Sequence, residues 1–353
     1  MNEKTLKRLI QAAGILANPT TGPSVAVFMN VYDKAFSRYE RPDYSLVPGL
    51  YFYDRIKEDL PREEISFMSG NVRLQGYYYK CKNPKGLVIT AHGLHSGADD
   101  YLPIQKYFYD HSFNVFSFDY KGTYSSDGDS TVGACLALVD LDSAIKFVKS
   151  DDRFKGLPIF LFGHSWGGYA VLSVLSIHKD IKACAAISPM VNGHSIINDK
   201  AYEYAGLMSY MTKPYIIVYQ RYLFKEYVDY DAVKGINESN IPCFIAHGID
   251  DKVINYFTQS VTAKKDLITN PNVIFYDSIG YHGDHNDILL SFDAICYKKE
   301  IESILKIEEN KNPNFNLDDK REFYKNIDHK RYSSPNLDIM DPILNMFLNT
   351  LDK

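Results

Sequence analysis

Cysteine is scarce in this sequence and forms no closely spaced pair. The 353 residues include five cysteines, which are Cys81, Cys135, Cys184, Cys243 and Cys296. No two of them are near enough for a CxxC metal or redox site, and an odd, scattered set is typical of reduced, mostly buried thiols. Because disulfides persist in oxidising compartments, these thiols favour the cytoplasm.

Blocks of like charge and long apolar runs are also lacking. The net charge is −5 at pH 7, spread over the chain, so neither a nucleic-acid partner nor a polybasic membrane anchor is expected. No run reaches the roughly 18 apolar residues of a membrane-spanning helix, so stable membrane insertion is not expected either. Basic residues precede an apolar stretch in the opening MNEKTLKRLIQAAGILANP, but Gln11 interrupts it, which favours an amphipathic surface helix over a signal peptide.

The sequence does contain a regular alternation of apolar and helical segments. The short apolar runs are LVITAH, VFSFD, IFLFG, CAAIS, CFIAHG and VIFYD. Helical stretches lie between them, at residues 102–111, 136–149, 166–178 and 257–268. Continuous apolar strands separated by helices predict an α/β fold, in which a mostly parallel sheet has helices on both faces. EEISFMS and LQGYYYK should form a hairpin that precedes this sheet.

Three segments fall outside the alternation and divide the chain. Residues 1–62 are helical and rich in tyrosine, and they are expected to pack on the core domain, residues 63–306. Residues 189–241, rich in Tyr and Met, are longer than a crossover needs and predict a helical lid insertion. Residues 307–353 should form a charged linker, EENKNPNFNLDDK, and a terminal helix, DIMDPILNMFLNTL.

One short stretch carries the strongest chemical signal. Gly163-His164-Ser165-Trp166-Gly167 fits G-x-S-x-G, with an apolar strand before it and a helical pattern after it. The glycines allow a sharp turn that lifts the Ser165 hydroxyl clear of the sheet, and the N-terminus of the helix favours developing negative charge. A tight turn with an incidental serine is the alternative, but the flanking strand and helix favour a nucleophile.

A nucleophilic serine needs a base and a carboxylate that orients the base. The sequence offers both at the ends of later strands. Asp250 and Asp251 follow the strand CFIAHG, and His282 and His285 follow the strand VIFYD.

An oxyanion hole needs two N–H donors. One should be the amide of Trp166, directly after the serine, and the other that of Leu94, which follows His92-Gly93 at the end of LVIT. No third ligand has suitable spacing to make His92 and His95 a metal site. Neither a metal nor an organic cofactor is expected.

Together these motifs resemble the α/β-hydrolase superfamily. Within it the chain is similar to serine hydrolases of the monoacylglycerol lipase and serine aminopeptidase type. The motifs HGLHSG, DYKGTYSSDG, GHSWGG and HGIDDKVI carry the resemblance, which covers residues 63–306.

The resemblance implies roles for several residues. Asp251, three residues after the glycine of HG, corresponds to the acid, and Asp119 and Asp127 to residues that organise a loop. His282 is preferred as the base because it lies nearer to the strand, with His285 as the alternative. The order of serine, acid and histidine is that of the superfamily.

The sequence therefore predicts a serine esterase that acts through a Ser-His-Asp triad and an acyl-enzyme. Its partner would be a small or medium acyl or aromatic ester, because the predicted lid supplies tyrosines and methionines for an apolar pocket. An aminopeptidase or a thioesterase would use the same triad, and a non-catalytic hydrolase-like binding protein is the alternative from a different class. The sequence gives no indication of the oligomeric state.

Overall fold

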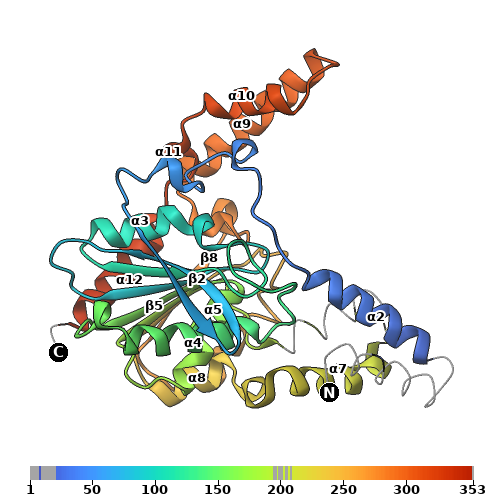
Figure 1. The fold of residues 1–353 in the computed structure, drawn as a ribbon, viewed down its shortest axis with the longest axis vertical. Helices are drawn as coiled ribbons and strands as arrows, with labels where there is room; N and C mark the ends of the chain where they lie inside the picture. The colour runs from blue at the N-terminus through green and yellow to red at the C-terminus, as the bar shows by residue number, and fades with distance from the viewer. Residues whose placement is uncertain are drawn as a thin grey trace.

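The protein is described by a computed structural model, which covers residues 21–193 and 209–351 together with Arg8, Ile197, Tyr202 and Gly206. Its centre is a sheet of eight strands (Figure 1). The strands in chain order are β1 Glu63–Ser69, β2 Val72–Tyr79, β3 Leu87–Ala91, β4 Asn114–Phe118, β5 Ile159–His164, β6 Ala183–Ile187, β7 Cys243–Gly248 and β8 Val273–Ser278.

The strands are ordered β1-β2-β4-β3-β5-β6-β7-β8 across the sheet. The β1–β2 hairpin and the β2–β4 pair are antiparallel, and the remaining pairs are parallel. This arrangement confirms both the mostly parallel sheet and the preceding hairpin that the sequence predicts. Because parallel strands end at one edge, the loops after β3, β5, β7 and β8 meet there.

Ten α-helices are described in these residues. They are α2 Thr21–Ala35, α3 Leu102–Asp110, α4 Leu136–Ser150, α5 Trp166–Ser173, α7 Ser209–Phe224, α8 Ala232–Ser239, α9 Phe292–Lys311, α10 Leu317–Lys325, α11 His329–Tyr332 and α12 Leu337–Asn349. Short 3-10 turns lie between several of them, including Ala98–Tyr101, Val174–Ser176 and Gly280–His282.

Helices cover both faces of the sheet, because its strands are apolar on both sides. In β3, Leu87 and Ile89 point into a core shared with α4, α5 and α8. Val88 points the other way, into a core shared with α3 and α12. Figure 1 shows α4 and α8 below the sheet and α3 above it. The alternation of side chains along one buried strand thus fills two cores.

The predicted lid insertion, residues 189–241, needs a correction at its C-terminal end. Helix α8 belongs to the body of the fold, since Ala232 and Ile236 are fully buried in the core beside α5. At Gly235 a Cβ atom would lie 2.0 Å from the carbonyl oxygen of Leu172, so helix and body are in backbone contact. The residues of the insertion that precede α8 are therefore the part that exceeds an ordinary connection between β6 and β7.

Helix α7 in this insertion packs against α2 of the leading segment. Met29 and Tyr32 of α2 form a buried cluster with Ile216 and Tyr219 of α7. Leu94, in the loop after β3, packs against the same cluster. The α2–α7 pair therefore lies beside a loop at the functional edge of the sheet.

Several predictions for these segments lie outside the described residues. The predicted surface helix at residues 1–19 is one of them, apart from Arg8. Within the insertion, nothing is described of the side chains of Tyr204, Met208, Tyr210 and Met211.

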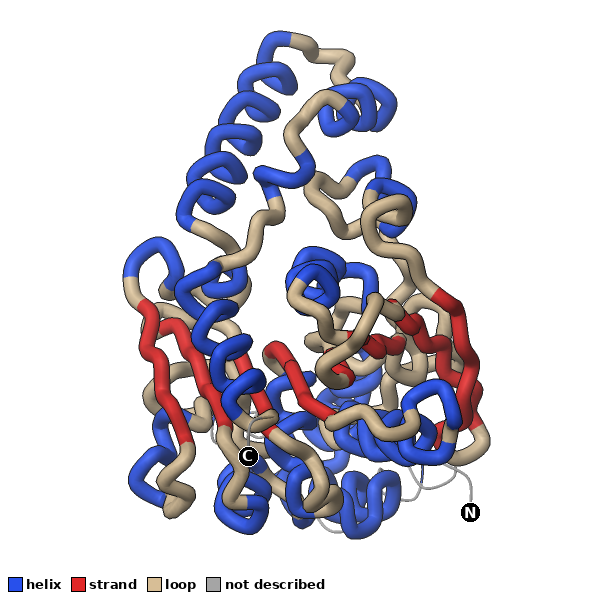
Figure 2. Tube along the Cα trace, turned by 90° about the vertical axis from the view of Figure 1, so that its left-hand side faces the viewer, coloured by secondary structure: helices blue, strands red, loops and turns tan. Residues whose placement is uncertain are grey.

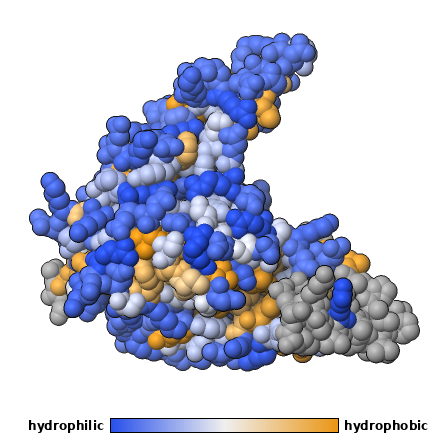
Figure 3. Space-filling view, in the orientation of Figure 1, coloured by the Kyte–Doolittle hydropathy of each residue, from blue (hydrophilic) through white to orange (hydrophobic). Residues whose placement is uncertain are grey.

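The C-terminal region projects from the body as an arm, formed by α9, α10 and α11 (Figure 2). Ile301 and Leu305 of α9 form a small core with Tyr324 and Tyr332. On the face shown in Figure 3, hydrophilic residues dominate the arm, and hydrophobic residues gather on the body below it. The arm therefore has a small hydrophobic core of its own, separate from the two cores on the faces of the sheet.

Two sequence-based boundaries were wrong. Residues 308–320 are not a plain linker, because α9 continues to Lys311 and Asn316 caps a new helix, α10, by accepting from the N–H of Asp318. The helix predicted at 257–268 is a 3-10 turn over Thr262–Leu267. Just before it, the side chain of Asn255 accepts from the N–H groups of Phe257 and Thr258, which competes with helix formation.

A buried ion cluster attaches the leading segment to the loop after β3. Asp99 is fully buried, and its two oxygens accept from Arg41 at 2.7 Å and from Arg62 at 2.5 Å. The guanidinium of Arg62 also lies 3.7 Å from the ring centre of Tyr53 and 4.0 Å from that of Tyr77. Removing one partner of such a pair leaves buried charge without compensation.

Replacing Asp99 by Asn should therefore lower the free energy of unfolding by about 3 kcal/mol. The matched control is Asp54→Asn, which breaks the exposed pair between Asp54 and Lys57 and should cost about 1 kcal/mol at most. Urea unfolding followed by circular dichroism measures both. Equal losses in the two variants would show that the Asp99 cluster does not hold the segment.

Candidate active site

Ser165 lies on a sharp turn between β5 and α5. Its backbone angles, φ 56° and ψ −115°, are ones that residues with a side chain rarely adopt. The turn requires small neighbours. A Cβ atom at Gly163 would lie 2.4 Å from the carbonyl oxygen of Gly167, and one at Gly167 would lie 2.1 Å from that of Ala91. The predicted strand, turn and helix around this serine are therefore present.

The side chain of His285 lies between Ser165 and Asp251. Its Nε2 is 2.8 Å from Ser165 Oγ, and its Nδ1 is 2.6 Å from Asp251 Oδ2. All three residues are buried, with Ser165 8% exposed, and they come from the loops after β5, β7 and β8. This is the geometry in which a carboxylate orients an imidazole and the imidazole accepts a serine proton.

The structure brings His285, the alternative base, to Ser165 and not His282, which the sequence favoured. A 3-10 turn over Gly280–His282 follows β8. Because His282 belongs to this turn, the backbone returns to the edge of the sheet only after it. The backbone then passes close to β7, since a Cβ atom at Gly248 would lie 2.2 Å from the carbonyl oxygen of Gly283. His285 therefore faces Ser165, whereas His282 makes no such contact, and its Nε2 has no hydrogen-bond partner among the described residues.

Asp251 is held as an ionised acceptor. Its Oδ1 accepts from the N–H groups of Val253 at 2.7 Å and Ile254 at 2.8 Å, and His247 Nε2 lies 3.1 Å from its Oδ2. Burial raises the pKa of this carboxyl, but hydrogen bonds from His247 and His285 outweigh burial, so the pKa lies well below its usual value. The neighbouring Asp250 instead donates its N–H to Gly283 at 3.0 Å.

The two predicted oxyanion donors lie on either side of the serine. Trp166 is the first residue of α5, so its N–H is one of the helix's free donors. Leu94 follows Gly93, and a Cβ atom at Gly93 would lie 3.5 Å from Ser165 Cβ. The loop after β3 thus lies against the serine. Within the described residues, neither the N–H of Leu94 nor that of Trp166 makes a hydrogen bond.

His164 and Tyr101 also reach this site, and sequence reasoning did not identify them. His164 Nδ1 is 2.7 Å from the hydroxyl of Tyr101, and its Nε2 is 3.0 Å from the carbonyl oxygen of His285. The position of His164 beside the serine is visible in the motif. Its partners are more than 60 residues away in the chain, and no local pattern indicates them.

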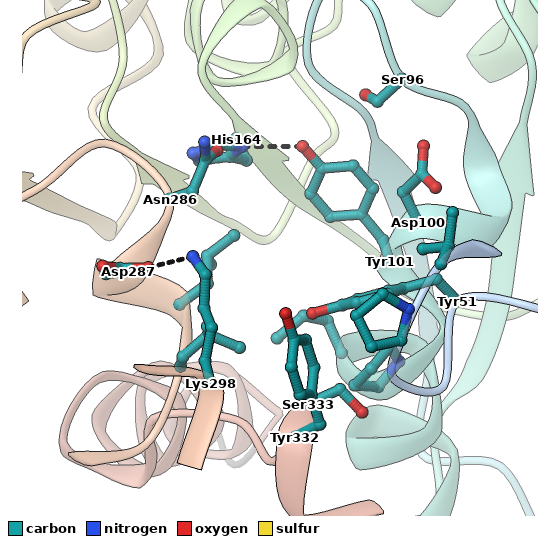
Figure 4. Close-up of a pocket in the computed structure, with 16 residues that line it drawn as sticks. Tyr51, Ser96, Asp100, Tyr101, His164, Asn286, Asp287, Lys298, Tyr332 and Ser333 are labelled. Atoms are coloured by element: carbon teal, nitrogen blue, oxygen red, sulfur yellow. Dashed lines mark hydrogen bonds and ion pairs between the residues drawn. The ribbon is translucent and has the colours of Figure 1, made fainter. Parts of the chain in front are cut away.

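A cavity of about 320 Å³ adjoins the site on the side of His164 (Figure 4). Its wall includes Tyr101 and Asn286 next to the site, and Tyr332 of the arm. Figure 4 shows Tyr51 of the leading segment on the side of Tyr101, and Lys298 of α9 across from it on the side of Asp287. Apolar side chains complete the wall, among them Val47, Pro48, Pro103, Ile104, Leu289 and Leu290.

The two aspartates of the motif DYKGTYSSDG hold loops near the site. Asp119 is fully buried and accepts from the Tyr77 hydroxyl and the Ala98 N–H, each at 2.9 Å. Burial raises its pKa to about 6. Asp127 accepts from Arg73 at 2.7 Å. Neither carboxyl takes part in the contacts between Ser165, His285 and Asp251.

In residues 21–193 and 209–351, no group of three or more His, Cys, Asp or Glu side chains is placed to hold a metal ion. In the same part of the chain, every helix is too short or too polar to span a bilayer.

Comparisons with known proteins agree with the motifs. Residues 82–233 match the model of the family described as serine aminopeptidase, S33. A polyketide transferase, grgF, from Penicillium sp is 25% identical over 137 residues, which are 38% of this chain and 47% of that protein. Human monoglyceride lipase is 25% identical over 144 residues, 39% of this chain and 46% of the lipase. The chain thus matches just under half the length of these curated relatives.

Solved structures extend the likeness over more of the chain. The esterase Pf2001 of Pyrococcus furiosus superposes with a TM-score of 0.53 at 20% identity, covering 78% of this chain and 98% of the esterase. A likeness at this identity establishes the fold. The chain has the α/β-hydrolase fold, and the resemblance to this superfamily that the four motifs indicated is confirmed.

Two buried histidines near the site are predicted to stay uncharged at neutral pH. Burial lowers the pKa of both His92 and His164 to about 3. Both imidazoles should therefore remain neutral between about pH 5 and 8, where an exposed histidine changes its charge. Two-dimensional NMR of histidine ring nitrogens, assigned with His92→Gln and His164→Gln, measures this. A titration midpoint near 6.5 for either ring would contradict the buried, neutral state.

Proposed function

We propose that the chain is a serine hydrolase that cleaves carboxylic esters. The observation that carries the proposal is the position of the His285 ring, 2.8 Å from Ser165 Oγ and 2.6 Å from Asp251 Oδ2. Ser165 is the nucleophile, His285 the general base and Asp251 the acid that orients it.

The first half of the reaction forms an acyl-enzyme. Ser165 Oγ attacks the ester carbonyl carbon while its proton passes to His285 Nε2, and Asp251 stabilises the imidazolium. The negative oxygen of the tetrahedral intermediate accepts hydrogen bonds from the N–H groups of Leu94 and Trp166. The bond to the leaving alcohol then breaks, and His285 returns the proton to the alcohol oxygen.

The second half releases the acid. A water molecule gives a proton to His285 Nε2 and attacks the acyl carbonyl, and the same two amides hold the new oxyanion. The bond to Ser165 Oγ breaks, and His285 donates the proton to the serine. The carboxylic acid leaves, and the starting state is restored without a metal or organic cofactor.

We assign the acyl or aromatic group of the substrate to the cavity beside His164, which is lined by Tyr101 and His164 but not by Ser165 or His285. Its volume of about 320 Å³ lies at the lower end of ligand pockets in proteins, which span roughly 300–1,000 Å³. The wall combines aliphatic side chains with the rings of Tyr51 and Tyr332. A short acyl chain or an aromatic ring matches such a wall, and a long triglyceride exceeds it.

The relatives support the class of reaction, and they differ in their substrates. Monoglyceride lipase and the Pf2001 esterase carry ester chemistry in their names, whereas the matching family is named after an aminopeptidase. An aminopeptidase or a thioesterase would use the same three side chains. A non-catalytic binding protein would not need a buried serine that contacts a histidine.

The state of the cysteines supports the cytoplasm as the compartment. All five cysteines are free, and Cys135, Cys184 and Cys243 are buried. Unpaired thiols are typical of a reducing environment.

The roles of the two histidines are tested by single substitutions. His285→Ala should lower kcat for p-nitrophenyl butyrate by about 10⁴-fold or more, because no other group takes the serine proton. His282→Ala is the matched control and should change kcat by less than about tenfold. Ser165→Ala should abolish both hydrolysis and labelling by a fluorophosphonate.

Circular dichroism and the unfolding temperature check that each variant is folded. A folded Ser165→Ala protein that still labels at the wild-type rate would place the nucleophile elsewhere. An active His285→Ala beside an inactive His282→Ala would reverse the assignment of the base.

A series of p-nitrophenyl esters tests the substrate class. Each CH₂ group that enters an apolar pocket contributes about 0.8 kcal/mol, so kcat/KM should rise severalfold per carbon until the pocket is full. We expect the maximum at a short or medium chain, followed by a decline. A maximum at about sixteen carbons, the longest ester of the series, would indicate a lipase. Cleavage of amino-acyl arylamides without esterase activity would indicate an aminopeptidase.

A further inference from the structure

A chain of hydrogen bonds runs behind the candidate triad and ends on the base. The N–H of Gly93 donates to the hydroxyl of Tyr101 at 3.0 Å. That hydroxyl is 2.7 Å from His164 Nδ1, and His164 Nε2 is 3.0 Å from the carbonyl oxygen of His285. Figure 4 shows the hydroxyl of Tyr101 directed at the ring of His164. All four groups are buried.

The chemistry of the four groups fixes the direction of every hydrogen bond. A carbonyl oxygen only accepts, so His164 Nε2 must carry a proton. Burial lowers the pKa of His164 to about 3, which keeps the ring neutral and leaves a lone pair on Nδ1. The hydroxyl of Tyr101 must then donate to Nδ1 and accept from Gly93. A single arrangement of protons therefore satisfies all three hydrogen bonds.

The ends of this chain are the parts of the site that must be aligned. Gly93 directly precedes Leu94, one of the two proposed oxyanion donors. His164 directly precedes Ser165, and the carbonyl at the far end belongs to His285 itself. Three loops that are distant in sequence are thereby connected through two side chains.

We propose that Tyr101 and His164 are positioning residues. They hold the loop that carries Leu94, and the ring of His285, in the correct position relative to Ser165. The proposal rests on the proposed function, since it assigns Ser165 and His285 to catalysis. Tyr101 and His164 act through other groups and exchange no proton with the substrate. Both residues line the cavity, but the Tyr101 hydroxyl and the two ring nitrogens of His164 already bind protein partners, so these polar atoms are not free to bind a substrate.

An alternative role for these contacts is plain stability of the core. Buried polar groups need partners in any protein, and the loss of one partner is costly wherever it occurs. The two roles differ in what a substitution changes. A stabilising contact affects the unfolding temperature, whereas a positioning contact also affects the chemical step in the protein that remains folded.

Tyr101→Phe removes one oxygen and breaks the chain at its centre. Misplacement of catalytic groups by about 1 Å costs up to about 100-fold in rate, so kcat should fall by about 10- to 100-fold. KM should change by less than about threefold, because the interactions lost act in the transition state. The rate of fluorophosphonate labelling should fall together with kcat.

Tyr107→Phe is the matched control. Tyr107 lies in α3, and its half-buried hydroxyl donates to Asp341 in α12, away from the site. This variant also loses one tyrosine hydroxyl, together with one hydrogen bond where Tyr101→Phe loses two. It should keep the wild-type kcat, even where its unfolding temperature falls as much as that of Tyr101→Phe.

A double-mutant cycle tests whether Tyr101 acts through His164. His164→Ala removes the link to the carbonyl of His285, and His164→Leu, which fills the space, replaces it in the cycle if the alanine protein does not fold. If the two residues act as one unit, the loss of kcat in the double variant is well below the product of the two single losses. Losses that multiply would show that they act independently, and the proposal would be wrong.

Wild-type labelling separates this proposal from the proposed function. A wild-type protein that does not react with the fluorophosphonate would refute the serine hydrolase, and the positioning role with it. A wild-type protein that reacts, beside a Tyr101→Phe protein that reacts equally fast, would refute the positioning role alone. The expected result is a reactive wild type, an equally reactive Tyr107→Phe and a Tyr101→Phe slowed by about 10- to 100-fold.

Discussion

The end of β3 and the start of α5 approach each other so closely that no side chain fits between them. A Cβ atom at Gly167 would lie 2.1 Å from the carbonyl oxygen of Ala91, and glycine avoids this clash. This contact fixes where α5 begins, and therefore where Ser165 is forced into its unusual backbone conformation. The other groups of the site are arranged around this one point.

Segments outside the matching core build the surroundings of the site. The family match ends at residue 233 and begins at residue 82, whereas α2 and the arm lie beyond these limits. On one side, His95 in the loop after β3 donates from Nε2 to the carbonyl oxygen of Ala35, at the end of α2. On the other side, Tyr51 and Tyr332 close the cavity. The surroundings of the candidate site are thus built by segments outside the family match, although its sheet is common to the fold.

The sequence was sufficient for those features that depend on local patterns. Apolar runs predicted the strands, and the glycines beside Ser165 predicted the turn, because both depend on neighbours in the chain. The base could not be chosen in this way, since His285 reaches Ser165 only through a 3-10 turn and a close approach of Gly283 to Gly248.

Long-range contacts account for the other features that the sequence did not reveal. The pairing of α2 with α7 depends on Met29 and Ile216, which are far apart in the chain. Tyr101 and His164 are joined across 63 positions. The charge of residues 308–320 suggested a linker, so the helix that Asn316 caps was not predicted.

The residue after Ser165 gives the folded protein an internal fluorescent reporter. Trp166 is the single tryptophan of the chain, and its ring is 3% exposed. Its indole N–H donates to the carbonyl oxygen of Ala134, and its ring lies 5.1 Å from that of Tyr120. All indole fluorescence of the protein therefore originates at the first residue of α5. A change in emission on unfolding, or on reaction of Ser165 with a fluorophosphonate, would report the environment of the turn at Ser165 alone, without any attached dye.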